Sequence, residues 1–251
     1  MSDQVARTAA FRALHEKGCF ILPNPWDAGS AKRLERLGFK ALASSSSAAA
    51  WTLGLTDHQI TLEQILDHLT RLCAATDLPV NADFESGFAD SPEGVATNVK
   101  RALTTGIAGL SIEDQVSQGG GLYPTEFAAT RIKAARSAID ASGTGALLIA
   151  RTEAYLNGIH DVNVAIERMT AFSEAGADCL FAPGMTDPAE IEATVRAVAP
   201  KPVNVLIMTP EMRVADLATL GVRRVSVGGA LAAAAWRGFD KAAAALAEQM
   251  I

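Results

Sequence analysis

The amino-acid sequence predicts an α/β fold, a single (β/α)8 barrel domain over residues 1–251. Short apolar runs alternate with amphipathic helical segments along the chain, as in folds built of βα units. We count eight such runs, whose starts lie about 29 residues apart on average, the length of one βα unit. Because barrels of roughly 250 residues usually form one domain, eight units favour a closed barrel over an open doubly wound sheet.

The expected elements follow one another at regular intervals. The strands cover residues 19–22, 41–45, 80–84, 109–114, 146–152, 179–183, 202–207 and 224–229. Amphipathic patterns predict helices over residues 2–17, 61–75, 92–105, 125–140, 162–175, 188–198 and 211–220. Several of these helices are followed by Gly just before the next strand, where a left-handed residue commonly ends a helix.

The charge balance limits the classes of partner. The chain has 22 Lys and Arg against 28 Asp and Glu, a formal net charge of −6 and an isoelectric point near 5.3. Nucleic acids and anionic membranes bind through clustered Lys and Arg, so we expect neither as a partner. No apolar run reaches the roughly 20 residues of a membrane span, and no secretory signal pattern is found. We expect a cytoplasmic protein.

Polar side chains gather where the expected strands end, which is where barrel enzymes carry their active sites. These positions hold Asn24, Asp27, Ser44, Ser45, Ser46, Ser47, Asn81, Asp83, Glu85, Glu113, Asp114, Gln115, Arg151, Glu153, Asn204 and Ser226. One such residue would be expected to pair within a buried polar layer. The five carboxylates between residues 83 and 153 that converge with one Arg, however, repel one another unless a cation lies among them. Oxygen ligands without Cys or His predict Mg²⁺, with Mn²⁺ as a substitute.

The residue types missing from the strand ends exclude other chemistry. No Lys is placed to form a Schiff base, which excludes an imine-forming aldolase. Cys179 begins its strand, and Cys19 and Cys73 lie at a strand start and on a helix, so no thiol nucleophile is expected. His58 lies near the rim, but a single His on a loop is expected to be solvated.

Four segments resemble the isocitrate lyase/phosphoenolpyruvate mutase superfamily over most of the chain. They are SSSSAAAWTLGLTD at residues 44–57, NADFESGF at 81–88, GLSIEDQ at 109–115 and ARTEAYLNG at 150–158. Their order and spacing along eight units make the match specific. The resemblance implies Mg²⁺-dependent chemistry on α-keto or 2-hydroxy acids through an enolate held by the metal.

The resemblance also implies roles for individual residues. The predicted substrate site consists of Ser44, Ser45, Ser46, Arg151 and Asn204, to which we add Trp26. The predicted metal site consists of Asp57, Asp83, Glu85 and Glu113. In this scheme Asp83 matches the second Asp of a DxD motif, Glu113 the Glu of an ED pair, and Arg151 the Arg of an AR-x-[DE] strand. Glu113 and Arg151 are also the expected catalytic groups.

Two departures from the family pattern stand out. Asn81 occupies the first position of the DxD motif as we align it, and the additional Glu85 would restore the lost charge. A Gly-rich segment at residues 115–123 replaces the Lys- and Cys-rich loop of the lyases. It is expected to be a hinged lid or a surface loop. With no thiol acid available, Tyr123 on this segment becomes the predicted proton donor, because a phenol stays protonated at neutral pH.

We therefore expect a Mg²⁺-dependent carbon–carbon lyase or decarboxylase that acts on a small keto or hydroxy di- or tricarboxylic acid. The alternatives are a phosphorus–carbon mutase or hydrolase, and a barrel that binds keto acids without turnover. The resemblance implies a homodimer or homotetramer that exchanges its C-terminal helix. Gly238, which divides residues 230–251 into two expected helical pieces, suits that exchange.

Overall fold

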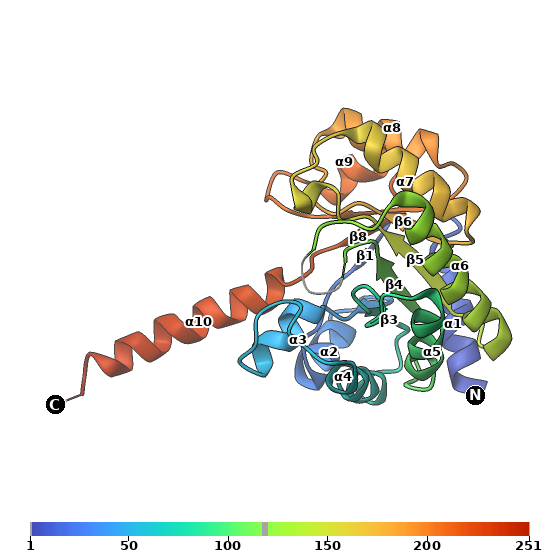
Figure 1. Ribbon diagram of the computed structural model, residues 1–251. Coiled ribbons are helices and arrows are strands. Elements are labelled where there is room, and N and C mark those ends of the chain that lie inside the picture. Colours follow the sequence, from blue (N-terminus) through green and yellow to red (C-terminus); the bar gives the residue numbers. More distant parts are fainter. Residues whose placement is uncertain (1, 117–119, 251) are drawn as a thin grey trace.

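Eight parallel strands form a nearly closed barrel (Figure 1). The computed structural model describes residues 2–116 and 120–250. The strands are β1 (Phe20–Leu22), β2 (Leu42–Ala43), β3 (Val80–Asp83), β4 (Gly109–Glu113), β5 (Leu147–Arg151), β6 (Cys179–Phe181), β7 (Val203–Leu206) and β8 (Arg224–Ser226). Their order is β1-β8-β7-β6-β5-β4-β3-β2. At the seam between β1 and β2, the Ala43 N–H donates to the Pro23 carbonyl at 3.0 Å. The predicted barrel is confirmed.

Helices surround the strands. They are α1 (Ser2–Leu14), α2 (Ala28–Arg36), α3 (Ser46–Thr52), α4 (Leu62–Ala75), α5 (Pro92–Leu103), α6 (Thr125–Ser142), α7 (Val162–Glu174), α8 (Pro188–Ala197), α9 (Val214–Thr219) and α10 (Ala230–Ala247), with a 3-10 turn η1 (Tyr155–Asn157). Each observed strand lies within its predicted range. The sequence predicts a helix that ends at Leu37 and Gly38, and α2 confirms it, beginning at a capping box formed by Asp27 and Ser30. The sequence prediction did not specify α3 and η1.

The bottom of the barrel is closed by α1. Phe11 of this helix is 0% exposed, and its ring packs edge-on against His15 and Phe20 with centroids 4.8 and 6.4 Å apart. Burial lowers the pKa of His15 to about 4, so His15 is neutral at pH 7 and packs as an aromatic ring. The strand ends that face α1 are therefore sealed by apolar contacts, and the opposite ends remain open.

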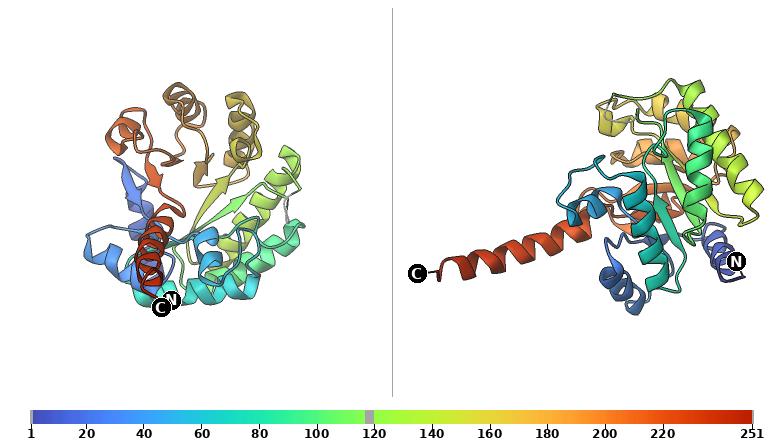
Figure 2. Two further views of the ribbon diagram at one scale, coloured as in Figure 1. Left: turned by 90° about the vertical axis from the view of Figure 1, so that its left-hand side faces the viewer. Right: turned by 60° about the horizontal axis from the view of Figure 1, so that its bottom comes forward.

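Helix α10 projects away from the barrel (Figures 1 and 2). It runs unbroken through Gly238, so the predicted division into two pieces is wrong. Gly238 has open space around it, and the Ala-rich sequence on both sides is strongly helix-forming, which offsets the roughly 1 kcal/mol cost of one Gly. Phe239 and Leu246 of α10 are 62% and 68% exposed. Among the described helices, not one combines the length and the hydropathy that crossing a bilayer requires.

Phe11→Ala tests the bottom seal. We expect it to lower the free energy of unfolding by about 3–5 kcal/mol, because the cavity cannot refill between α1 and the strands. Chemical denaturation measures this loss. Val5→Ala is the control on the same helix, since Val5 is 49% exposed and its truncation should cost less than about 0.5 kcal/mol. Equal losses in the two variants would contradict the assignment of Phe11 as the seal.

Candidate active site

A cavity of about 190 Å³ opens at the C-terminal ends of the strands. Most of its polar lining comes from residues that the sequence singled out. These are Asn24, Ser44, Ser45, Ser46, Ser47, Asp57, Asn81, Asp83, Glu113, Arg151 and Ser226, with Gly228 and Gly229 beside them. The lining also includes His58, Ser111 and Arg224, for which the sequence predicts no site role.

Asp83 ends β3 and is held by donors on both oxygens. Its Oδ2 accepts from the backbone N–H and the hydroxyl of Ser46, each at 3.0 Å. Its Oδ1 accepts from Arg151 Nη1 at 3.3 Å and from the Ser111 hydroxyl at 3.4 Å. These four donors fix the orientation of the Asp83 carboxylate, which lines the cavity.

The serines after β2 position Asp83 and begin the next helix. The Ser44 hydroxyl accepts from the Asp83 N–H at 2.8 Å, while Asn24 Nδ2 donates to the Ser44 carbonyl at 2.9 Å. The Ser45 hydroxyl caps α3 by accepting from the Ala48 N–H at 3.3 Å. All three predicted serines line the cavity, so the structure brings them together with Asp83 and Arg151.

Arg151, at the end of β5, lies among three carboxylates. Its Nε contacts Glu153 closely and lies 3.5 Å from Glu113 Oε2, and its Nη1 lies 3.3 Å from Asp83 Oδ1. Burial raises the pKa of Glu113 well above its ordinary value, and the Arg151 charge counteracts this. Burial also acts against the guanidinium, but the three carboxylates hold the pKa of Arg151 above its ordinary value. Arg151 is the fixed counter-charge of the site.

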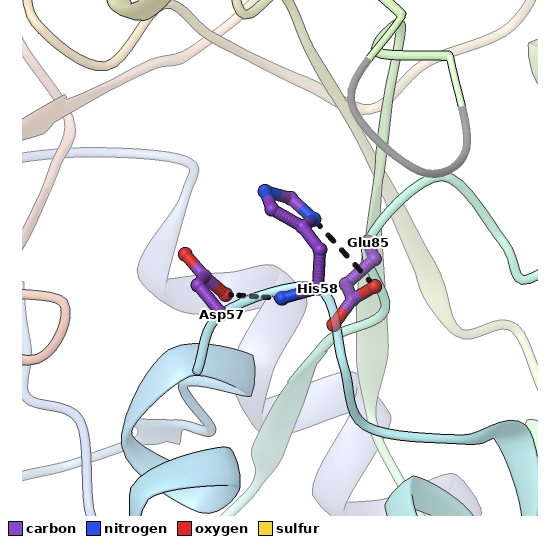
Figure 3. Close-up of side chains that lie close together, drawn as sticks. All are labelled: Asp57, His58 and Glu85. Carbon is purple, nitrogen blue, oxygen red and sulfur yellow. Dashed lines mark hydrogen bonds and ion pairs between the residues drawn. The ribbon is translucent and has the colours of Figure 1, made fainter. Parts of the chain in front are cut away.

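Asp57, His58 and Glu85 form a second group at the rim (Figure 3). One ligand atom from each lies within 4.8 Å of the others. His58 Nδ1 is 3.7 Å from Glu85 Oε2 and 3.9 Å from Glu113 Oε1. Its interaction with Glu85 raises the pKa of His58 to about 9, with burial acting in the opposite direction. His58 is exposed, as expected for a loop residue, and its ring also faces two carboxylates.

The backbone at the rim is unusual. His58 and Glu85 have φ values of 61° and 44°, a region that residues other than Gly seldom adopt. Such conformations persist where surrounding structure enforces them, and they concentrate at functional sites. Glu85 is 8% exposed, and its Oε1 has no hydrogen-bond partner among the described residues.

This group fits a divalent cation. A buried carboxylate oxygen without a partner is costly, and a cation would satisfy it. Asp57, Glu85 and Glu113 offer carboxylate oxygens, which suit Mg²⁺ or Mn²⁺. His58, with its pKa raised to about 9, carries a proton at pH 7 and lies beside these oxygens as a positive charge. Asn81 lies two residues deeper than Asp83, opposite Gly109 of β4. The acidic pair at the rim is thus Asp83 and Glu85, and Glu85 does not replace a charge lost at Asn81.

Three predicted site residues lie elsewhere. Tyr123 donates to Asp90 Oδ1 at 2.5 Å beneath the guanidinium of Arg131, so its hydroxyl anchors the segment and does not line the cavity. Asn204 is buried under the cavity, where its Oδ1 accepts from Arg224 Nε at 3.0 Å. Trp26 lines a separate cavity of about 390 Å³ beside α2, α3 and α4.

The two ends of the segment at residues 115–123 pair with each other. Gln115 and Leu122 form an isolated antiparallel bridge, and the Val116 N–H donates to the Gly121 carbonyl at 2.8 Å. Residues 117–119 lie outside the described part of the chain. The hinged lid stays a prediction.

Fold and site together define a barrel protein with an acidic pocket at the C-terminal mouth. The chain belongs to the phosphoenolpyruvate phosphomutase family, whose model matches residues 11–247. Its curated relatives include lyases and decarboxylases, so the predicted superfamily is confirmed.

Two curated relatives illustrate the range of the family. The oxaloacetate decarboxylase of Chromohalobacter salexigens is 35% identical over 238 residues, which cover 88% of this chain and 78% of that protein. The 2-methylisocitrate lyase of Escherichia coli is 34% identical over 186 residues, 71% of this chain and 62% of that protein.

Solved structures share the whole fold. A Burkholderia cenocepacia J2315 protein named for a lyase or mutase activity is 44% identical with a TM-score of 0.95, and the match covers 99% of this chain and 90% of that one. Oxaloacetate acetylhydrolase is 25% identical with a TM-score of 0.90, over 98% of this chain and 89% of that one in its complex with the product oxalate. It has also been solved with the inhibitor 3,3-difluorooxaloacetate.

Arg151→Met tests whether this guanidinium balances the site. At pH 7 we expect the free energy of unfolding to fall by about 3–5 kcal/mol, because buried carboxylates lose their partner. In the folded protein, burial keeps the pKa of Glu113 and Glu153 above 4.5, so these groups ionise at higher pH than they do in the unfolded chain. Without Arg151, their ionisation in the folded protein costs still more. The loss of stability in the variant should therefore grow between pH 4 and pH 7. Urea denaturation at both pH values measures it.

Magnesium should recover part of this loss, because a cation at the rim replaces some of the missing positive charge. Arg136→Met is the control: Arg136 is as buried as Arg151, with side chains 18% and 17% exposed, and pairs with Asp140 and Asp178 instead. Its loss should not respond to Mg²⁺. Equal responses in both variants would overturn the assignment.

Proposed function

We propose that the protein is a Mg²⁺-dependent carbon–carbon lyase or decarboxylase acting on a small keto or hydroxy dicarboxylic acid. The arrangement of Asp57, Glu85 and Glu113 beside the Arg151–Asp83 pair carries this proposal. Carboxylates at this density favour a cation, and the open mouth leaves room for an anionic ligand between the cation and Arg151. When bound, the cation would polarise a keto oxygen and stabilise negative charge that develops there.

The chain's own residues supply the rest of the mechanism. Asp57, Asp83, Glu85 and Glu113 would hold the cation, and Ser46 orients the Asp83 carboxylate through its N–H and hydroxyl. Arg151 presents a planar set of donors to a carboxylate or to the developing enolate oxygen. The hydroxyls of Ser44 and Ser45 and the N–H of Ser45 lie on the same wall and would contact the substrate carboxylate, whereas the Ser44 N–H donates to the Asn81 carbonyl at 2.8 Å.

The absence of a nearby thiol favours decarboxylation over the lyase reaction. None of Cys19, Cys73 and Cys179 lines the cavity in the described chain, and burial raises the pKa of both Cys73 and Cys179. The oxaloacetate decarboxylase relative matches along 88% of this chain, which supports the same choice. Phosphorus–carbon chemistry and binding without turnover are the alternative outcomes of the test below.

Asp83→Asn tests the proposal. We expect turnover of oxaloacetate, followed by NMR as pyruvate release, to need Mg²⁺ and to fall by roughly 100-fold or more in the variant, because the carboxylate is a hard oxygen ligand. Oxalate binding with Mg²⁺, measured by calorimetry, should weaken in parallel. Asp67→Asn is the control, since Asp67 is exposed on α4.

The same assay includes 2-methylisocitrate, 2,3-dimethylmalate and phosphonopyruvate. Turnover of phosphonopyruvate alone would replace the proposal with phosphorus–carbon chemistry. Oxalate binding without turnover of any compound would indicate a binding protein. Full turnover in chelator-treated protein would remove the metal.

We also propose that the protein is a homodimer or homotetramer in which α10 of one copy packs on another. Trp236 and Phe239 are 40% and 62% exposed on this projecting helix, and Ile21 on the outer face of β1 is 37% exposed. A second copy of α10 would cover both apolar surfaces.

Trp236→Glu should therefore shift the mass seen by light scattering toward the monomer, because a charge replaces buried apolar area in the assembly. Lys241→Glu, also on α10 and exposed, should leave the mass unchanged. A wild-type protein that is monomeric at micromolar concentration would contradict the proposal.

A further inference from the structure

Arg224 lies at the floor of the central cavity. It begins β8, points into the barrel and is 2% exposed. Its Nε donates to Asn204 Oδ1 at 3.0 Å, and its guanidinium carbon lies 6.0 Å from the centre of the Phe11 ring. Its Nη1 has no hydrogen-bond partner among the described residues. The guanidinium of Arg224 is therefore held at Nε, while its Nη1 is left without an acceptor.

The other buried arginines have carboxylate or carbonyl partners at their terminal nitrogens, although Arg168 Nε also lacks a hydrogen-bond partner among the described residues. Arg151 pairs with three carboxylates, and Arg168 pairs with Asp114 at 2.8 Å. Arg131 donates to backbone carbonyls, among them those of Ala89 at 2.8 Å and Asp90 at 3.1 Å. Within residues 2–116 and 120–250, no ion pair involves Arg224.

A second polar atom of this floor is also unmatched. Asn81 is 2% exposed and lines the same cavity, and its Oδ1 has no hydrogen-bond partner among the described residues. A Cβ at Gly109 would lie 3.1 Å from this oxygen and 3.0 Å from Phe11 Cε1, so Gly109 keeps the floor open beside Phe11. Two side chains from different strands thus bring unmatched polar atoms to one end of the cavity.

A buried cation without a counter-charge is unfavourable. Burial lowers the pKa of Arg224, and smaller opposing influences come from Cys179 and Asp83. Burial raises the pKa of the Cys179 thiol, so Cys179 stays neutral at pH 7 and provides no charge. An anion that enters the cavity would supply both the charge and the acceptors that Arg224 lacks.

We propose that Arg224 is a specificity-determining residue that binds the second carboxylate of a dicarboxylic substrate. The keto-acid end of that substrate then lies at the mouth, near Arg151, and its far carboxylate reaches the floor. Asn204 is a positioning residue that orients the guanidinium through Nε. Asn81 Oδ1, an acceptor, suits a substrate hydroxyl or a water that bridges to the bound carboxylate. This inference rests on the proposed function, because it assumes that the keto-acid end binds at the mouth.

Two inhibitor-like probes separate the ends of the cavity. Oxalate corresponds to the keto-acid end alone, and 3,3-difluorooxaloacetate adds a far carboxylate. Calorimetry in Mg²⁺ should show that Arg224→Met weakens 3,3-difluorooxaloacetate by roughly 10- to 100-fold, as expected for the loss of a charged hydrogen bond. Oxalate binding should change by less than about 3-fold. Arg224→Lys should recover part of the loss, because it restores the charge without the planar donor set.

Arg223→Met is the matched control. Arg223 is the adjacent residue on the same strand approach, and it donates to the Gly18 carbonyl on the exposed surface. Neither probe should weaken in this variant. Asn204→Ala keeps Arg224 but frees its guanidinium, and should give a smaller loss for 3,3-difluorooxaloacetate only. It also provides a second measurement if Arg224→Met does not fold, which circular dichroism will show.

Each remaining outcome has one meaning. Unchanged binding of both probes in Arg224→Met, or equal weakening of both, would overturn the role of Arg224 and leave it a structural residue hydrated by buried water. Failure of oxalate to bind the wild-type protein would instead overturn the proposed function, and with it this inference.

Discussion

The mouth of this barrel is organised by the need to balance several carboxylates at close range. Arg151 contacts Glu153, Glu113 and Asp83, and its single positive charge cannot neutralise all three. The surplus negative charge adjoins His58 and Glu85, where a cation would be most favourable. In the proposed function, metal binding and anion binding would therefore be two consequences of one electrostatic constraint, because a bound cation and Arg151 would together leave a positive surface between them.

A buried scaffold holds this arrangement in place. Arg131 is 0% exposed and donates to the backbone carbonyls of the turn after β3 and of Glu113 at the end of β4. It thereby joins the two segments that carry Glu85 and Glu113. Glu85 and Phe88 within that turn have φ values of 44° and 55°, so the clamp also maintains backbone conformations that would otherwise relax. The Asp114–Arg168 pair does the same for the other side of Glu113, since Asp114 Oδ1 accepts from the Glu153 N–H at 2.8 Å.

The pattern of apolar runs was sufficient to predict all eight strands, because the strands of the barrel are buried and each therefore consists of a short run of apolar residues. The strand-end rule likewise located Asp83, Glu113 and Arg151. It could not predict hydrogen bonds between segments that are distant in sequence. The Tyr123 hydroxyl donates to Asp90, and Arg224 donates to the amide oxygen of Asn204. Arg224 itself was missed because it begins its strand, the end away from the mouth. The rule that site residues lie at the C-terminal ends of strands fails for a long side chain, because such a side chain can reach the cavity from the other end of its strand.

Charge is consequently layered along the barrel axis. Carboxylates and His58 form the rim, Arg151 lies just inside it, and Arg224 lies at the floor near Phe11. A neutral ligand would gain little from this sequence of charges, and a cationic one would be repelled as it moved inward. An elongated anion gains at two levels, provided that a metal ion first offsets the negative rim. The same layering fixes the direction in which such a ligand enters, because only its chelating end can remain with the cation while its other end meets the buried guanidinium.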